Sequence, residues 1–187
     1  MTDEIPQQHD LNWLHRAARR GAKLNYLHFW GHSEPPHSAV GKACLSQWYP
    51  APFIIDGLRF STAEHYMMFR KAQLFGDHET AQQIPSAASP AAVKALGRKV
   101  RGFQEVLWEQ HRVAIVVAGN YAKFSQSPAL LGFLRDTKRR VLVEASPVDN
   151  VWGIGLSADD PHAENPLEWR GLNLLGFALM DVRARLR

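Results

Sequence analysis

The fold of this chain is decided by one stretch, Ser61-Thr62-Ala63-Glu64-His65-Tyr66-Met67-Met68-Phe69-Arg70-Lys71. Its pattern predicts a helix that is apolar on nearly every side, and such a helix normally lies in the core. Ionisable groups are costly there unless they are paired or used. Glu64 and Lys71 stand seven residues apart, which places them on one stripe of the helix with Met68 between them. We therefore expect both side chains to face one cavity.

Both charged residues also have a purely structural interpretation. Ser61 and Glu64 form the pattern S-x-x-E, a capping box in which the glutamate only closes the first helical turn. A lysine such as Lys71 commonly extends its ammonium to solvent along an apolar stem. The sequence leaves these alternatives open.

The composition is typical of a globular chain with one substantial core, since 45% of its 187 residues are hydrophobic and 21% are charged. The longest uninterrupted apolar run, residues 113–118, is far shorter than the roughly 20 residues that span a bilayer, so we expect no membrane segment. The first residues carry several acids and no apolar signal segment, which predicts a cytoplasmic protein.

Cysteine and histidine usage favours neither a disulfide nor a metal site. Cys44 is the only cysteine, which excludes an internal disulfide and leaves no cysteine pair for a structural zinc. Histidines are numerous, but no H-E-x-x-H or similar ligand spacing occurs. We predict neither metal nor cofactor, and the sequence leaves the oligomeric state open.

A net charge of +4 suits anionic ligands. The basic residues come in four short groups, at positions 16–23, 94–101, 138–140 and 183–187. Three of these groups lie near predicted helix ends, where cations complement the helix dipole, so ordinary helix chemistry explains much of the pattern. We therefore expect a phosphate-bearing small molecule or a nucleic-acid end rather than nucleic-acid binding as the main function.

The remaining elements predict the α+β class, with a single, mainly helical domain and a few short strands. Residues 1–25 form a polar extension with a basic amphipathic helix, and residues 26–187 form the main domain. Asp56-Gly57 predicts a hairpin, and further strands are expected near residues 26–30 and 141–143. Further helices are expected over residues 89–97, 104–124, 127–134 and 173–186.

The long helix over residues 104–124 carries an apolar pattern with helical spacing. This pattern predicts a core-facing stripe through Leu107, His111, Ala114, Ala118 and Tyr121, widened by Trp108, Ile115 and Val116.

Residues 146–155 suit neither helix nor strand. Trp152 follows Asp149 by three residues and precedes Gly153 and Gly155, a composition typical of an ordered loop that lines a site. The alternative is a tryptophan that simply packs over a turn.

Taken in order, these segments resemble the NADAR family, also called YbiA-like, over about residues 26–186. The resemblance rests on short motifs: Phe29-Trp30, Trp48-Tyr49-Pro50, Pro52-Phe53, Asp56-Gly57, Glu64-His65-Tyr66, Lys71, Gly97-Arg98, Trp108, Lys123-Phe124, Val143-Glu144, Asp149, Trp152-Gly153, Gly155, Gly171, Asn173, Gly176 and Arg183.

Members of this family are N-glycosidases. The bacterial and plant members that the chain is similar to hydrolyse the bond between base and ribose in phosphorylated ribosylaminopyrimidine intermediates of riboflavin biosynthesis, and others remove ADP-ribose from guanine bases. The resemblance therefore implies a phosphorylated ribosyl small molecule or an ADP-ribosylated nucleic acid as substrate. A catalytically silent module that binds ADP-ribose or NAD is the alternative.

By resemblance, Glu64, Trp108, Asp149 and Trp152 fall on the family's functional positions. Breaking an N-glycosidic bond builds positive charge on the sugar, which a nearby carboxylate stabilises. We predict Glu64 as the principal acid or base, Asp149 as the second carboxylate and Lys71 as a candidate nucleophile that would form an imine. The residues that we expect to bind substrate are Phe29, Arg98, Trp108, Lys123, Trp152, Gly153 and Asn173.

One departure from the family concerns position 154. Some relatives carry an acidic residue between the two glycines that follow the tryptophan, where this chain has Ile154. A role of that acid in ligand binding therefore does not carry over.

Overall fold

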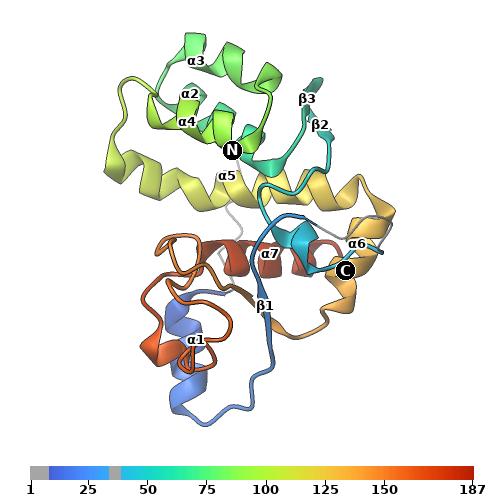
Figure 1. Cartoon of the computed structure of the whole chain (residues 1–187), viewed down its shortest axis with the longest axis vertical. Helices are drawn as coiled ribbons and strands as arrows, with labels where there is room; N and C mark the ends of the chain where they lie inside the picture. Colours follow the sequence, from blue (N-terminus) through green and yellow to red (C-terminus); the bar gives the residue numbers. More distant parts are fainter. Residues whose placement is uncertain (1–8, 34–38) are drawn as a thin grey trace. The chain divides into compact units, whose positions relative to one another are not determined.

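The structure, a computed structural model, describes residues 9–33 and 39–187 and resolves into two compact units (Figure 1). Unit 1 comprises Met1–Trp30 and Arg135–Arg187, and unit 2 comprises Gly31–Leu134. Helices predominate, with a few short strands, which confirms the α+β class. Within the described residues, no helix is both long enough and apolar enough to cross a membrane.

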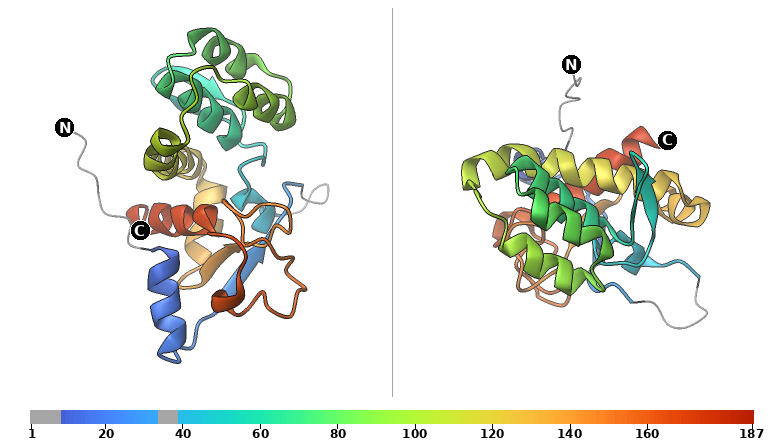
Figure 2. Two further views of the ribbon diagram at one scale, coloured as in Figure 1. Left: turned by 90° about the vertical axis from the view of Figure 1, so that its left-hand side faces the viewer. Right: turned by 90° about the horizontal axis from the view of Figure 1, so that it is seen from above.

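Unit 2 is built around α2 (Ala63–Leu74), which packs against α3 (His78–Gln83), α4 (Pro90–Arg98) and α5 (Glu105–Ser125). Figure 2 shows the three shorter helices, in green, gathered beside the long α5. The residues from Ala63 to Met68 form an unbroken buried run, so every side of the first turns of α2 faces protein. This confirms the prediction of a core helix.

Two glycines let the neighbouring helices approach α2 closely. A Cβ at Gly97 of α4 would lie 2.0 Å from the Met68 sulfur, and a Cβ at Gly119 of α5 would lie 2.6 Å from the Tyr66 ring. Side chains at these two positions would therefore push α4 and α5 away from the helix that carries Glu64.

The hairpin at Asp56-Gly57 is confirmed. β2 (Phe53–Ile55) pairs antiparallel with β3 (Leu58–Phe60), and both turn residues adopt positive φ, 50° at Asp56 and 77° at Gly57. Aspartate followed by glycine suits such a turn because both tolerate left-handed backbone conformations. The other elements of unit 2 are η1 (Lys42–Leu45), η2 (Ile84–Ser86) and α6 (Pro128–Asp136), which extends into unit 1.

Unit 1 contains a two-stranded parallel sheet of β1 (Tyr26–Phe29) and β4 (Val141–Glu144), with α7 (Leu174–Arg185) packed against β4. The N-terminal helix α1 (Leu11–Arg19) packs against η3 (Pro166–Glu168). Leu14 of α1 is fully buried, so this helix contributes to the core of unit 1.

The predicted core-facing stripe of α5 is wrong. His111, Ala114, Ala118 and Tyr121 are exposed, whereas the buried face carries Trp108, Arg112, Ile115, Val116, Gly119, Asn120 and Lys123. Three polar side chains, those of Arg112, Asn120 and Lys123, are buried on this helix. A prediction from the spacing of apolar residues places polar residues on the surface. The buried face is therefore rotated from the one that the apolar pattern suggested.

Candidate functional site

The start of α2 places Glu64 in the second helical position. Thr62 is the N-cap: its hydroxyl oxygen accepts the His65 backbone N–H at 3.4 Å and lies 2.8 Å from the His65 Nδ1. The backbone N–H of Glu64 donates instead to the carbonyl of Gln47 at 3.0 Å. A capping box from Ser61 to Glu64 is therefore wrong, because a different residue caps the helix.

The Glu64 side chain is enclosed, with 3% of its residue surface exposed. A carboxylate in the first turn of a helix is stabilised by the positive end of the helix dipole. Glu64 also acts on Lys71 electrostatically, because its negative charge favours the protonated ammonium and opposes the lowering of the Lys71 pKa. Met68, between them on the same stripe, is buried as expected.

Lys71 is half-buried rather than extended freely into solvent. Its ammonium donates a hydrogen bond of 2.9 Å to the carbonyl of Gly97, and it lies 4.3 Å from the ring centroid of Phe103 and 5.5 Å from that of Trp108. Burial lowers the pKa of Lys71, while the charges of Glu105 and Glu64 act in the opposite direction. A lysine in such an environment reaches its nucleophilic, neutral form more readily than one in water.

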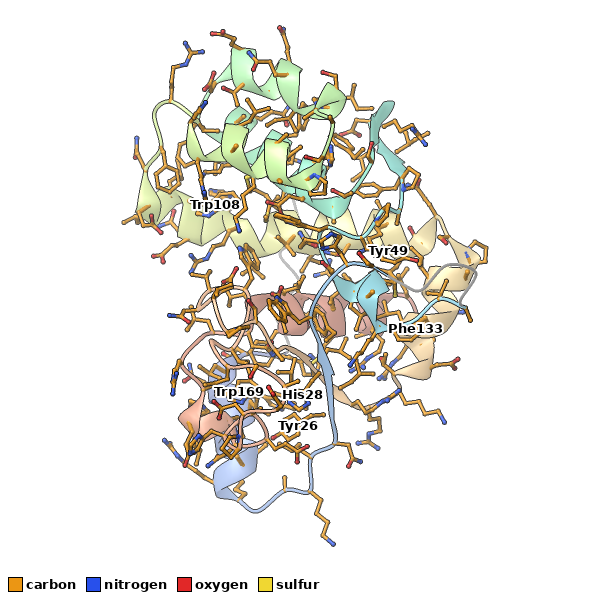
Figure 3. The ribbon with its side chains drawn as sticks, in the orientation of Figure 1. Tyr26, His28, Tyr49, Trp108, Phe133 and Trp169 are labelled. Atoms are coloured by element: carbon orange, nitrogen blue, oxygen red, sulfur yellow. The ribbon has the colours of Figure 1, made fainter. Side chains whose placement is uncertain are left out.

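Trp108 lies near the Lys71 ammonium, and Arg98 follows the residue whose carbonyl binds it. Trp108, labelled on α5 in Figure 3, is 8% exposed. Arg98 ends α4 and is exposed, next to Gly97 whose carbonyl binds Lys71. Unit 2 thus brings a carboxylate and an indole to the amine of Lys71, and it carries the exposed guanidinium of Arg98 one residue after the carbonyl that Lys71 binds.

Lys123, predicted as a substrate-binding residue, is buried and does not lie on the surface. Only 1% of this residue is exposed, and its ammonium donates a 2.8 Å hydrogen bond to the carbonyl of Ser46 beneath the ring of Tyr49. Burial lowers the pKa of Lys123 to about 7, with the charge of Cys44 acting in the opposite direction.

A buried polar network near Glu64 was missed in the sequence. Asn120 of α5 donates its side-chain amide to Gln47 Oε1 at 2.7 Å and to the Val116 carbonyl at 2.9 Å. Gln47 in turn accepts the Glu64 backbone N–H, so the network fixes the entry of α2. The available signal was Asn120 itself, a polar residue inside an otherwise apolar helical run.

In unit 1, Asp149 holds the loop that follows β4. Its Oδ1 accepts the backbone N–H of Val151 at 2.9 Å and that of Trp152 at 2.7 Å. This is an Asx-type turn, in which the carboxylate replaces a backbone acceptor and fixes the following residues. Asp149 therefore sets the backbone position of Trp152, a half-buried side chain.

Gly153 and Asn173 join this loop to β4 and α7. A Cβ at Gly153 would lie 2.8 Å from the Glu144 carbonyl oxygen, so only glycine fits without displacing backbone. Asn173 is fully buried in a left-handed conformation with φ 53°. Its Oδ1 accepts the Glu144 N–H at 2.9 Å, its Nδ2 donates to the Leu142 carbonyl at 2.9 Å, and its backbone N–H donates to the Gly153 carbonyl at 3.0 Å.

Phe29 and Ile154 are core residues of unit 1. Phe29 ends β1 opposite Glu144 and is 1% exposed. Ile154 is fully buried, and its backbone is bonded to Glu144 and Arg170. Within the described part of the chain, no three His, Cys, Asp or Glu side chains gather where they could hold a metal ion.

Comparison with known proteins decides the family. The family model of the NADAR domain matches residues 28–187. The chain belongs to the NADAR family. The N-glycosidase R617 of Acanthamoeba polyphaga mimivirus is 40% identical over 163 residues, which cover 84% of this chain and 94% of that protein.

Two further comparisons support the NADAR assignment. The solved NMR structure of the E. coli protein YbiA has a TM-score of 0.69 and 26% identity, and the match covers 87% of this chain and 84% of that one. The maize riboflavin biosynthesis protein PYRR is 33% identical over 138 residues, covering 70% of this chain but 20% of that protein. The chain is therefore an N-glycosidase, a hydrolase of N-glycosyl compounds.

Proposed function

We propose that this NADAR chain hydrolyses the bond between a base and a phosphorylated ribose, with ribosylaminopyrimidine phosphates of riboflavin biosynthesis as substrates. The main support is the enclosed carboxylate of Glu64, which acts electrostatically on the half-buried amine of Lys71 seven residues along α2. The likeness to a maize protein named for riboflavin biosynthesis favours this substrate class.

In the proposed reaction, Glu64 is the principal acid or base. As the bond between C1′ and the base nitrogen breaks, its electron pair leaves with the base, and the ribose gains positive charge that a carboxylate stabilises. The Glu64 carboxylate accepts a proton from the attacking water and passes it to the departing base, so that Glu64 ends the reaction ionised, as it began.

Lys71 offers a covalent route for the same reaction. Its neutral Nζ would attack C1′ as the bond between C1′ and the base nitrogen breaks. One Nζ proton goes to the departing base and the other to O4′ as the ribose ring opens, which leaves an imine between Nζ and C1′. Water then hydrolyses the imine, which releases the sugar phosphate and restores the amine. The lowered pKa of Lys71 supports this route because it increases the fraction of neutral amine.

Substrate binding in this proposal uses flat rings and cations. The Trp108 ring, next to the Lys71 ammonium, offers a face on which a base could stack, a contact worth about 1–3 kcal/mol. Exposed Arg98 is the proposed phosphate ligand on unit 2, and buried Lys123 is assigned to support of the Ser46 backbone.

For unit 1, taken by itself, we propose a carboxylate role for Asp149 and a stacking role for the Trp152 ring. Asn173 and Gly153 would contribute indirectly, by holding the loop that carries Asp149 and Trp152, because the side chain of Asn173 is hydrogen-bonded to β4. Phe29, buried at the end of β1, stays a predicted substrate-binding residue.

The substrate is tested by incubating purified protein separately with ribosylaminopyrimidine phosphates and with DNA that carries ADP-ribose on guanine. Free base is followed by chromatography and mass spectrometry. The proposal predicts release of base from the first substrate. Release of base only from the DNA would contradict the proposed substrate and indicate ADP-ribosylated nucleic acid instead. Nucleotide binding without release of any base would indicate a catalytically silent binding module.

Borohydride reduction tests the covalent route. Reduction during turnover should trap the sugar phosphate on the protein, and peptide mapping should locate it at Lys71. Trapping should disappear in Lys71→Ala and persist in Lys42→Ala, which removes an exposed lysine of η1. Trapping at another residue, or no trapping while base is being released, would contradict the covalent role of Lys71. The absence of trapping would favour direct attack by water on C1′.

A further inference from the structure

A strongly basic pocket lies in unit 1, and none of the residues used in the proposed reaction lines it. Its volume is about 970 Å³, and three segments form its wall: the N-terminal region around α1, the turn between α6 and β4, and one face of the C-terminal part of α7. Cavities of this size are large enough for a nucleotide or cofactor.

Among the described residues, six cationic side chains and one carboxylate side chain line the wall. The cations are Lys23, Lys138, Arg139, Arg140, Arg183 and Arg187, and the carboxylate is Asp136. Across residues 9–33 and 39–187, none of these six cations forms an ion pair with an acidic side chain. Asp181 lies 3.1 Å from the ring nitrogen of His9, another residue of the wall. The pocket therefore has a large excess of positive charge.

Arg183 shows that this excess extends below the surface. It is 4% exposed, and its Nη1 donates to the hydroxyl of Thr137 rather than to a carboxylate. Burial lowers the pKa of Arg183 to about 10, and repulsion from Arg187 and Arg140 contributes to the shift. Arg183 is still charged at neutral pH, and burial of a charge without a counter-ion is costly. An anion in the pocket would supply that counter-ion.

The local geometry holds two of the neighbouring cations in place. Arg140 donates from Nε to the carbonyl of Thr137 at 3.2 Å and from Nη2 to that of Asp136 at 3.1 Å. Lys138 occupies the left-handed turn position with φ 54°, where glycine is the favoured residue. The turn thus presents its basic side chains from an ordered backbone.

An aromatic ring completes the pocket. Trp13 of α1 lines it and is half-buried, with its ring in edge contact with the ring of His9 at a centroid distance of 4.9 Å. A partly accessible indole beside arginines is a common platform for a nucleobase, because the base stacks on the ring while the guanidinium groups bind phosphate.

We propose that this pocket binds a nucleoside diphosphate, with the phosphates against Arg183, Arg140 and Arg187 and the base against Trp13. Several guanidinium groups without carboxylate partners suit a ligand with more than one negative charge. The pocket volume suits a whole nucleotide. This inference is independent of the proposed function, because it uses other residues and another readout.

The test is calorimetric titration of the full chain with ADP and, separately, with inorganic pyrophosphate. The matched variants are Arg187→Gln, which removes a pocket cation, and Arg185→Gln, which removes an exposed cation of α7 that does not line the pocket. We expect Arg187→Gln to weaken ADP binding by about tenfold, the usual effect of one charge-assisted contact. Arg185→Gln should leave the affinity within about twofold.

Trp13→Ala tests the orientation of the ligand. It should weaken the binding of ADP and leave the binding of pyrophosphate nearly unchanged, because only ADP carries a base. The proposal is overturned if ADP shows no saturable binding up to about 1 mM. Equal losses of ADP affinity in Arg187→Gln and Arg185→Gln would contradict a specific site and indicate general attraction by a basic surface. Equal affinities for ADP and pyrophosphate would contradict the proposed stacking of the base on Trp13.

Discussion

Two pairs of polar residues, one pair in each unit, are used in contrasting ways. In unit 1, the loop side chains of Asp149 and Asn173 direct their polar atoms at backbone groups, and those bonds hold the loop, β4 and α7 together. In unit 2, buried Glu64 and half-buried Lys71 act on each other electrostatically, and burial shifts the lysine toward its neutral form. Residue type therefore does not tell a scaffold side chain from a chemical one. A backbone partner alone does not tell them apart either, because Lys71 also donates to the Gly97 carbonyl.

The largest effect on folding that would sharpen this contrast is expected for Asn173→Ala. The change removes two buried hydrogen bonds to β4 and places alanine in a left-handed conformation, so we expect a loss of about 2–4 kcal/mol in the free energy of unfolding. Urea denaturation measures it. Asn173→Gly is the matched control because it keeps the backbone conformation available, and it should lose less. If Asn173→Ala lowered the free energy of unfolding by less than about 1 kcal/mol, Asn173 would not be important for the stability of this loop.

The effect of Lys123→Met comes next, and it should depend on pH. Between the lowered pKa of about 7 and the ordinary value of 10.5, the unfolded chain binds one proton more at this residue than the folded chain does. The contribution of Lys123 to the free energy of unfolding therefore rises with pH across that window, by at most about 1.4 kcal/mol per pH unit.

Denaturation of the native chain and Lys123→Met at pH 6, 8 and 9.5 should thus show a difference that moves in favour of the native chain as pH rises. Below pH 7, both states of the native chain are protonated at Lys123, so the difference should level off there. Parallel pH profiles for the two proteins would show that the ammonium is not buried in solution.

The smallest effect on folding is expected from Asp149→Asn. The asparagine Oδ1 can still accept the two backbone N–H groups of Val151 and Trp152, so the free energy of unfolding should change by no more than about 1 kcal/mol. Asp149→Ala removes both bonds and should cost more. If Asp149→Asn keeps its fold and its rate of base release, Asp149 belongs to the scaffold; a loss of that rate alone would assign it to the chemistry.

Local chemistry explains why many elements could be predicted. Ser89-Pro90 predicts the start of α4, and the structure has Ser89 as the N-cap with its hydroxyl bonded to the Ala92 N–H. Asp56-Gly57 predicts the hairpin because its turn requires positive φ. These signals lie within a few residues of the structure that they specify.

Long-range contacts explain most of what the sequence could not predict. The parallel pairing of β1 with β4 joins segments more than a hundred residues apart, and no local signal marks it. At the start of α2, both Ser61 and Thr62 are good N-caps, and the contact of the Glu64 N–H with Gln47 accompanies the use of Thr62. Polar residues on the buried face of α5 were likewise read as surface.

The central claim is that Glu64 performs chemistry, and Glu64→Gln tests it most directly. The substitution keeps the size of the side chain and removes its negative charge and its acid–base function. We predict that the rate of base release falls by about 10²–10⁴-fold while the free energy of unfolding stays close to that of the native chain. Retention of the rate, or unfolding of the variant, would show that the buried carboxylate serves the fold and would contradict the account.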